Sequence, residues 1–252
     1  DLFFIQGLTK DSLKKSVIIF IVLLVILPLL AVILKGPSVF NPDQILKPYE
    51  TVRPFTLTER LLTEPRIILF YISLLFYPMP QRLSICHDMA ISHSLINPPS
   101  TIIAILVILA VLGVCIIKST RWPLITYCVI FFFLNHIIEG SVFGLELIFE
   151  HRNYLPSMLL FVPLAVLVVK ALNFYSNRRA MQVVLSGFVI LVLVGFGHSA
   201  FMRNFVWKTS GTLWADAVNK APDLSRPHLN LGHFYTTRKM LERALPEFKT
   251  AS

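Results

Sequence analysis

The sequence predicts an all-α protein: a polytopic transmembrane helix bundle over residues 1–200, then the incomplete start of a helical repeat domain over 201–252. The first observation behind this fold class is composition. Of the 252 residues, 55% are hydrophobic and only 15% are charged, whereas soluble domains carry about 25% charged residues. Second, the apolar residues form continuous runs long enough to cross a bilayer. Third, the sequence after residue 200 turns polar and repeats a pattern of small and aromatic residues.

Five apolar runs have the length and composition of membrane spans. In chain order they are 17–34, 101–117, 124–138, 158–174 and 181–200. A sixth run, 66–80, is shorter and contains two prolines near its end. Runs of this length are more typical of re-entrant or interfacial segments than of spans.

Positive charge decides the topology. With five spans and a cytoplasmic N-terminus, the cytoplasmic side receives the basic residues Lys10, Lys14, Lys15, Lys118, Arg121, Lys170, Arg178 and Arg179. If 66–80 also crossed, Lys118, Arg121, Arg178 and Arg179 would all move outside, against the positive-inside rule. We therefore expect 35–100, the loop before 158 and the repeats on the outer face.

Charge and cysteine usage exclude two classes of function. The net charge is +9, but no basic block is interleaved with aromatic residues, so nucleic-acid binding is not predicted. Cys86, Cys115 and Cys128 form no CxxC pair, and neither a disulfide framework nor a zinc knuckle follows from them. We predict no metal site.

The C-terminal region has the spacing of a tetratricopeptide repeat. Its positions are Leu231, Gly232, Tyr235, Ala244, Phe248 and Ala251, and Trp214, Ala217 and Pro222 fall one 34-residue period earlier. Pro246 departs from the usual pattern. Fewer than three repeats cannot bury a core of their own, so we expect both ends of the chain to be internal to a longer protein. The alternative is a plain amphipathic helical hairpin.

Acidic residues gather between the third and fourth full-length runs. If 136–154 is helical, Glu139, Glu146 and Glu150 share one face, with His136 one turn earlier. A stripe of carboxylates at a membrane surface is expected to face water, a cation or a functional cavity. The three glutamates are candidate catalytic acids, and the alternative is a solvated face of an interfacial helix.

The residues that follow are candidates for substrate binding. Arg152 carries a planar fork of donors that suits a phosphate or a carboxylate, and His151 and Tyr154 flank it. The alternative is that Arg152 pairs with Glu146 or Glu150 and only fixes the loop.

A second polar cluster lies in 82–94 and holds Arg82, His87, Asp88 and His93. Its spacing matches no zinc signature. Arg82 and Asp88 are further binding candidates beside a cavity. The alternative is that the histidines of this cluster are simply exposed or hydrogen-bonded and have no role in binding. The sequence contains no dinucleotide fingerprint, P-loop or nucleophile elbow. No cofactor is evident, and a lipid-linked donor is compatible with that absence.

Two stretches together resemble a known family. ELIFEHRNYLPSM (146–158) and ERLLTEPRIILFYISLLFYPMPQRLSICHD (59–88), followed by tetratricopeptide repeats, resemble bacterial proteins of the type-C glycosyltransferase superfamily. They are similar to the transmembrane-and-tetratricopeptide-repeat protein O-mannosyltransferases. The matching residues are Arg152, Tyr154, Leu155, Pro156 and Ser157, whereas His151 separates Glu150 from Arg152.

The resemblance implies transfer of a mannose-like sugar from a polyprenyl-phosphate carrier to a protein acceptor. The reaction would take place on the periplasmic or lumenal face of a membrane, here the bacterial cytoplasmic membrane. Membrane lipid, the lipid-linked donor and a protein recruited by the repeats are the expected partners, and the residues give a divalent metal no support. The main catalytic acid of such enzymes usually lies in the first outer loop, so we expect it upstream of residue 1. Arg152 and Arg82 are expected to neutralise the leaving phosphate.

Two other functions compete with this one. A non-catalytic anchor could present the repeats as a scaffold for a cell-envelope complex. A transporter could use His136, Glu139 and Glu146 as a proton or cation path, but these residues lie at the end of a span rather than deep within it.

Overall fold

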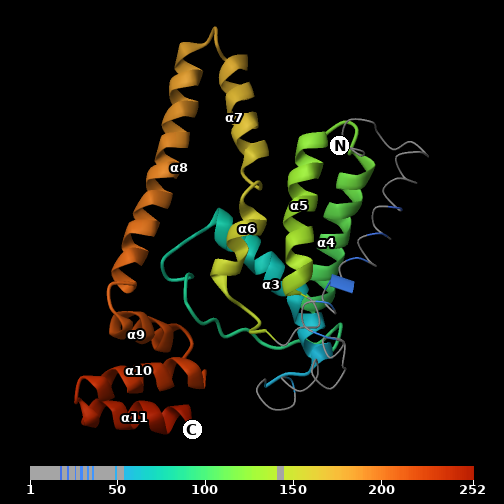
Figure 1. The fold of residues 1–252 in the computed structure, drawn as a ribbon. Coiled ribbons are helices and arrows are strands. Elements are labelled where there is room, and N and C mark those ends of the chain that lie inside the picture. The colour runs from blue at the N-terminus through green and yellow to red at the C-terminus, as the bar shows by residue number, and fades with distance from the viewer. Residues whose placement is uncertain are drawn as a thin grey trace. The chain divides into compact units, whose positions relative to one another are not determined.

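The computed structural model describes residues 54–140 and 145–252, together with isolated positions before residue 54. Within these residues all regular structure is helical and no strand occurs (Figure 1). The all-α class is therefore confirmed for the described chain. The predicted span 17–34 lies outside the described ranges.

The described chain divides into two compact units that interleave along the sequence. The first comprises the described residues up to Arg66, together with Ile91–Leu147 and Leu155–Pro163. The second comprises Ile67–Ala90, Ile148–Tyr154 and Leu164–Ser252. The boundary predicted at residue 200 lies inside helix α8, which runs from Arg179 to Val206.

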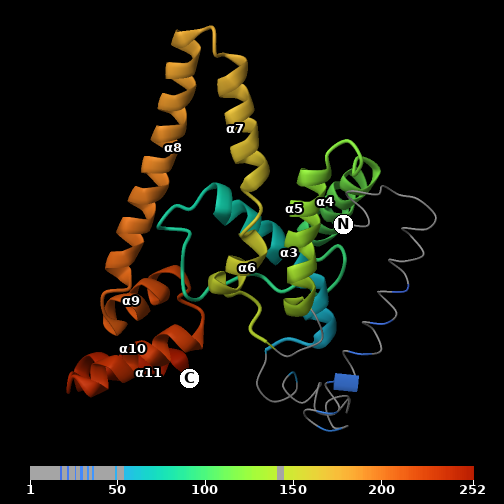
Figure 2. The ribbon, with the colours of Figure 1, turned by 45° about the horizontal axis from the view of Figure 1, so that its top comes forward.

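The first unit contains two adjacent apolar helices, α4 (Ser100–Ile117) and α5 (Pro123–Glu139), which lie side by side in Figure 1 and Figure 2. Pro123 suits the first turn of α5. Backbone N–H groups in the first turn of a helix have no partner within the helix, so a proline there costs no hydrogen bond. The hydroxyl of Thr126 donates to the carbonyl of Cys115 at 3.0 Å and ties the two helices together near their connection.

Helix α3 (Leu57–Phe76) begins at a capping box. The Glu59 carboxylate accepts the Thr56 backbone N–H at 2.8 Å, and the Glu59 N–H donates to the Thr56 hydroxyl at 3.3 Å. This reciprocal pair satisfies donors that a helix start leaves open. The second half of α3 covers most of the run predicted to be re-entrant or interfacial, and that membrane placement stays a prediction.

Two short helices, η2 (Glu150–Asn153) and α6 (Tyr154–Ser157), come next in the chain. Two apolar helices follow them, α7 (Val162–Phe174) and α8. α7 and α8 run antiparallel from the turn that joins them (Figure 1 and Figure 2).

Among the described residues, two helices are long and apolar enough to cross a membrane, namely α4 and α8. A third span results if Glu150–Ser157, which comprises η2 and α6, is counted as one with α7, from which it is bent by 53° at a short break. α5 is apolar but shorter. Most apolar side chains of α4 and α8 are exposed, as expected for helices that face lipid. Membrane insertion is thus supported, whereas a bundle of five spans stays a prediction.

The chain ends in three helices, α9 (Ser210–Lys220), α10 (Ser225–Thr237) and α11 (Leu241–Ala251). α10 packs against both neighbours. A Cβ built on Gly232 would lie 2.7 Å from the Phe248 ring, and one on Gly211 would lie 2.4 Å from the Phe234 ring. Glycine therefore lets an aromatic ring of the next helix approach the backbone closely. The three helices are thus closely packed, and the choice between a tetratricopeptide repeat and a plain helical hairpin stays a prediction.

The continuous helix considered for 136–154 is wrong. α5 ends at Glu139, and residues 145–149 are not helical. Gly140, which has low helix propensity, is the C-cap of α5, and Phe149 is extended with φ −139° and ψ 114°. The three glutamates consequently do not form one helical stripe.

Candidate functional site

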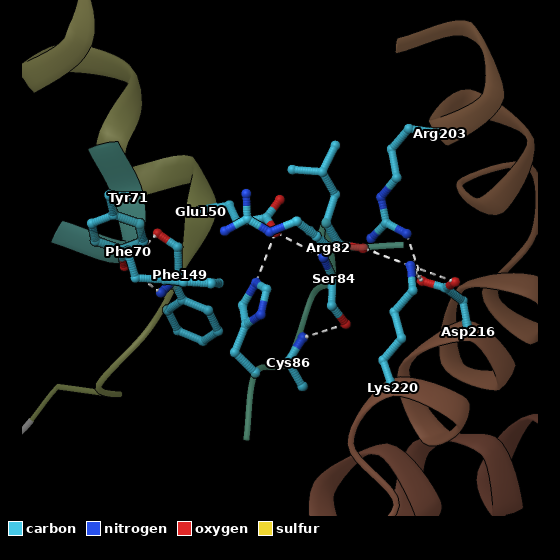
Figure 3. A network of polar contacts seen from close by, with 12 residues as sticks. Phe70, Tyr71, Arg82, Ser84, Cys86, Phe149, Glu150, Arg203, Asp216 and Lys220 are labelled. Atoms are coloured by element: carbon cyan, nitrogen blue, oxygen red, sulfur yellow. Dashed lines mark hydrogen bonds and ion pairs between the residues drawn. The ribbon is translucent and has the colours of Figure 1, made fainter. Parts of the chain in front are cut away.

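The Glu150 carboxylate is the centre of a polar network in the second unit (Figure 3). Its Oε1 accepts the backbone N–H of Ser84 at 2.7 Å and lies 2.7 Å from His87 Nε2. The Glu150 side chain is 27% exposed and that of His87 is 11% exposed. A carboxylate held by two donors and still open to solvent has an orientation fixed by its surroundings and an accessible face.

Tyr71 of α3 fixes the backbone directly before Glu150. Its hydroxyl accepts the Phe149 N–H at 2.8 Å and donates to the Phe149 carbonyl at 3.1 Å. Tyr71 is 2% exposed, so this pair of hydrogen bonds to Phe149 lies in the packed interior. It holds Phe149 extended, and Glu150 begins η2 immediately after it.

A cavity of about 250 Å³ lies beside Glu150. Its lining residues come from α3, from the loop that follows α3, and from η2, and they are Tyr71, Leu74, Leu75, Pro78, Leu83, Glu150 and Asn153. The walls are thus mainly apolar, and Glu150 and Asn153 supply polar groups. Ligand sites commonly combine apolar walls with a few placed polar groups.

His87 is oriented by two contacts. Besides the Glu150 carboxylate, its ring meets the Phe70 ring edge to face, with centroids 5.0 Å apart. A carboxylate partner favours the imidazole tautomer with hydrogen on the bound nitrogen. Glu150 and His87 therefore form a carboxylate–imidazole pair that can accept, hold or relay a proton.

Arg82 makes contacts with the end of α3 that the sequence does not predict. Its guanidinium donates to the carbonyls of Ser73 and Tyr77 at 3.3 and 3.1 Å and to the Ser73 hydroxyl at 2.7 Å. It also lies over the rings of Phe70 and Tyr77. Carbonyls at a helix end lack partners within the helix and attract cations. These contacts place Arg82 at the C-terminal end of α3, and its role in phosphate binding stays a prediction.

Arg152 stands two residues after Glu150 and is half-buried. Its guanidinium carbon lies 4.7 Å from the centroid of the Phe149 ring. Glu150 Oε1 contacts Ser84 and His87, and the alternative that Arg152 pairs with Glu146 or Glu150 stays a prediction. His151 is exposed with its ring 5.2 Å from that of Phe149, and Tyr154 is 82% exposed.

Protein-family models, curated protein sequences and solved structures give no match to this chain.

The structure describes the surroundings of the other predicted residues as follows. Glu146 is half-buried in the segment before η2, and Asp88 is exposed. Glu139 is the last residue of α5, and the structure does not describe its side chain. His93 contacts Glu59 at 2.6 Å in the first unit, and His136 is buried against Phe132. In the described ranges, no group of three or more His, Cys, Asp or Glu residues could hold a metal ion.

Sequence reasoning did not identify the contacts that hold the loop after α3. The Lys220 ammonium of α9 donates to the carbonyls of Pro80 and Leu83, both at 2.7 Å. The Ser199 hydroxyl of α8 donates to the Pro78 carbonyl. The acceptors are backbone carbonyls more than 120 residues away in sequence. The pattern of side chains along a sequence does not predict such contacts.

Proposed function

We propose that this chain is part of a membrane glycosyltransferase that transfers a mannose-like sugar from a polyprenyl-phosphate carrier to a protein acceptor on the periplasmic face. The observation that carries the proposal is the Glu150 carboxylate, fixed by Ser84 and His87 at the edge of an apolar cavity. The arginine two residues further on supports it.

The cavity suits the first part of an isoprenoid chain. Leu74, Leu75 and Leu83 line it, and apolar walls favour hydrocarbon because its burial removes apolar surface from water. A carrier bound there would bring its phosphate toward the polar groups of η2. Arg152 would neutralise that phosphate, since a guanidinium can donate two parallel hydrogen bonds to it.

The proposed chemistry needs one proton acceptor and one charge stabiliser. The acceptor hydroxyl oxygen forms a bond to the anomeric carbon of the sugar, and the bond from that carbon to the phosphate oxygen breaks. The hydroxyl proton passes to the Glu150 carboxylate, which acts as general base with His87 beside it. The lipid phosphate leaves with the electron pair of the broken bond, and Arg152 stabilises its charge.

Helices α9–α11 support a role in acceptor recruitment. Their glycine-to-aromatic packing at Gly211 and Gly232 agrees with the close helix pairs of tetratricopeptide repeats. We infer that these helices belong to such an array and that the array binds the acceptor protein.

The test is sugar transfer by the full-length protein in proteoliposomes supplied with polyprenyl-phosphate mannose and acceptor. Glu150→Gln removes the base while keeping the side-chain shape, and we expect kcat to fall about 100-fold or more. Arg152→Ala should lower kcat/KM by about tenfold or more, because the leaving phosphate loses a charged donor.

The matched control is Arg121→Ala, which removes an exposed arginine from the predicted cytoplasmic loop and should leave transfer unchanged. Wild-type rates in both Glu150→Gln and Arg152→Ala would remove this site from the reaction. If such variants still assemble with their partners, the scaffold function is favoured instead.

A further inference from the structure

One peptide unit joins the candidate base to a cation on α9 (Figure 3). The N–H of Ser84 donates to Glu150 Oε1 at 2.7 Å. The carbonyl of the same peptide group, which belongs to Leu83, accepts from Lys220 Nζ at 2.7 Å. An ammonium and a carboxylate thus bind the two ends of a single amide dipole.

The Lys220 ammonium is itself held firmly. It has three N–H donors, and its three acceptors are the carbonyls of Pro80 and Leu83 and the Asp216 carboxylate, the last at 2.8 Å. Asp216 also binds Arg203 of α8 at 2.5 Å, and Arg203 is 7% exposed. The cation therefore has a defined position relative to the loop.

We propose that Lys220 is a positioning residue for Glu150, acting through the peptide group between Leu83 and Ser84. The ammonium fixes the rotation of this peptide and so aims the Ser84 N–H at the carboxylate. It also polarises the amide, and hydrogen bonds in a chain strengthen one another. The catalytic consequence rests on the proposed function of Glu150, whereas the contact itself does not.

Helix α9 thus has a second role besides packing against α10. Because Lys220 and Asp216 lie one turn apart on α9, this helix carries both the cation and the carboxylate that orients it. Leu83, in the loop wall of the cavity, is consequently held by the same helix that leads into α10 and α11.

The experiment measures hydrogen exchange at the Ser84 amide in the full-length protein, together with steady-state transfer. Lys220→Met keeps the length of the side chain but removes the charge and the donors. We expect the Ser84 amide to exchange about tenfold faster, because a charge-assisted bond is loosened. kcat should fall by a similar factor while KM for the carrier changes little, and Lys220→Arg should restore most of both.

Lys249→Met is the matched control, since Lys249 is an exposed lysine in the last turn of α11. It should leave Ser84 exchange and transfer at wild-type values. If Lys220→Met does not fold, as judged by amide protection in α10 and α11, Lys220→Gln replaces it and still removes the charge.

Unchanged Ser84 exchange in the folded variant overturns the positioning role, even if Glu150→Gln abolishes transfer and the proposed function stands. Faster Ser84 exchange in a protein that shows no transfer in its wild-type form retains the positioning contact and rejects the proposed function. The two hypotheses therefore fail by different readouts.

Discussion

The Glu59 carboxylate makes three contacts at the start of α3. It accepts from the Thr56 N–H at 2.8 Å and the Thr56 hydroxyl at 3.0 Å, and it lies 2.6 Å from His93 Nδ1. The Thr56 backbone hydrogen bond, followed by the contact with His93, holds the pKa of this carboxyl below its ordinary value. The ionised form is therefore the one that stabilises the helix start.

This pKa gives a pH dependence with a defined sign. A carboxyl whose pKa is lower in the folded state adds stability above its unfolded pKa of about 4.3, and that stability is lost as the pH falls through the folded pKa. We expect Glu59→Gln to speed hydrogen exchange of the first-turn amides of α3 at neutral pH. The difference from wild type should vanish at low pH. An equal difference at both pH values would show that the charge of Glu59 plays no part.

Single residues also show which parts of the site could be predicted from the sequence and which could not. Glu150 is one of three candidate acids, because a carboxylate at a membrane surface is costly unless it faces water, a cation or a functional cavity. The sequence did not favour it over Glu139 or Glu146, since that choice depends on the Ser84 backbone N–H and the His87 ring. Lys220 was not a candidate, because a lysine that binds distant carbonyls looks like any lysine at a helix end.

At the scale of elements, α3 and the segment before η2 depart most from the expected helices. α3 begins at Leu57, well before the apolar run, because the capping box at Thr56 and Glu59 starts it there. It ends at Phe76, and Arg82 caps its last carbonyls. The apolar run 66–80 contains no sign of such side-chain caps, so it does not predict where α3 begins or ends. By contrast, the spacing of the small residues Gly232, Ala244 and Ala251 predicts close helix packing, and Gly232 does lie against the Phe248 ring.

The packing of α10 against α11 makes Gly232 a sensitive position. We expect Gly232→Val to destabilise these helices by about 2 kcal/mol, because the added atoms overlap the Phe248 ring and force it to move. The measurement is hydrogen exchange of α10 and α11 amides in the full-length protein.

The matched control for this substitution is Gly187→Val in α8. A Cβ at Gly187 meets nothing within 4 Å, so exchange in α10 and α11 should keep its wild-type rate. Equal protection of α10 and α11 in wild type and Gly232→Val would contradict the close approach of Phe248.

At the scale of the whole molecule, composition was enough to predict a helical membrane protein. It could not fix the number of spans, because α5 and the bent pair of Glu150–Ser157 and α7 lie near the length at which a helix can cross. Topology therefore depends on the distribution of charged loops, which predicts an outer position for the segment after α3.

Labelling tests this topology. Cys86, Cys115 and Cys128 are buried, so an added cysteine at the exposed position Ala90 should dominate reaction with an impermeant maleimide. We expect Ala90→Cys to react in right-side-out membrane vesicles and Arg121→Cys to react only in inverted ones. Reaction of residue 90 from the cytoplasmic side would reverse the topology and place the cavity on the wrong face for a periplasmic acceptor.

The length of α8 has a consequence for how a lipid would reach the cavity. Its 28 residues make a helix about 42 Å long, which exceeds the hydrocarbon thickness of a bilayer by about 12 Å. If the surplus lies at the end that bears Ser199 and Arg203, both residues stand at the depth of the lipid headgroups. The loop that Ser199 and Lys220 hold would then lie at the same depth. A lipid-linked substrate could present its phosphate there while its hydrocarbon tail remains in the bilayer, so catalysis would require no extraction of the carrier.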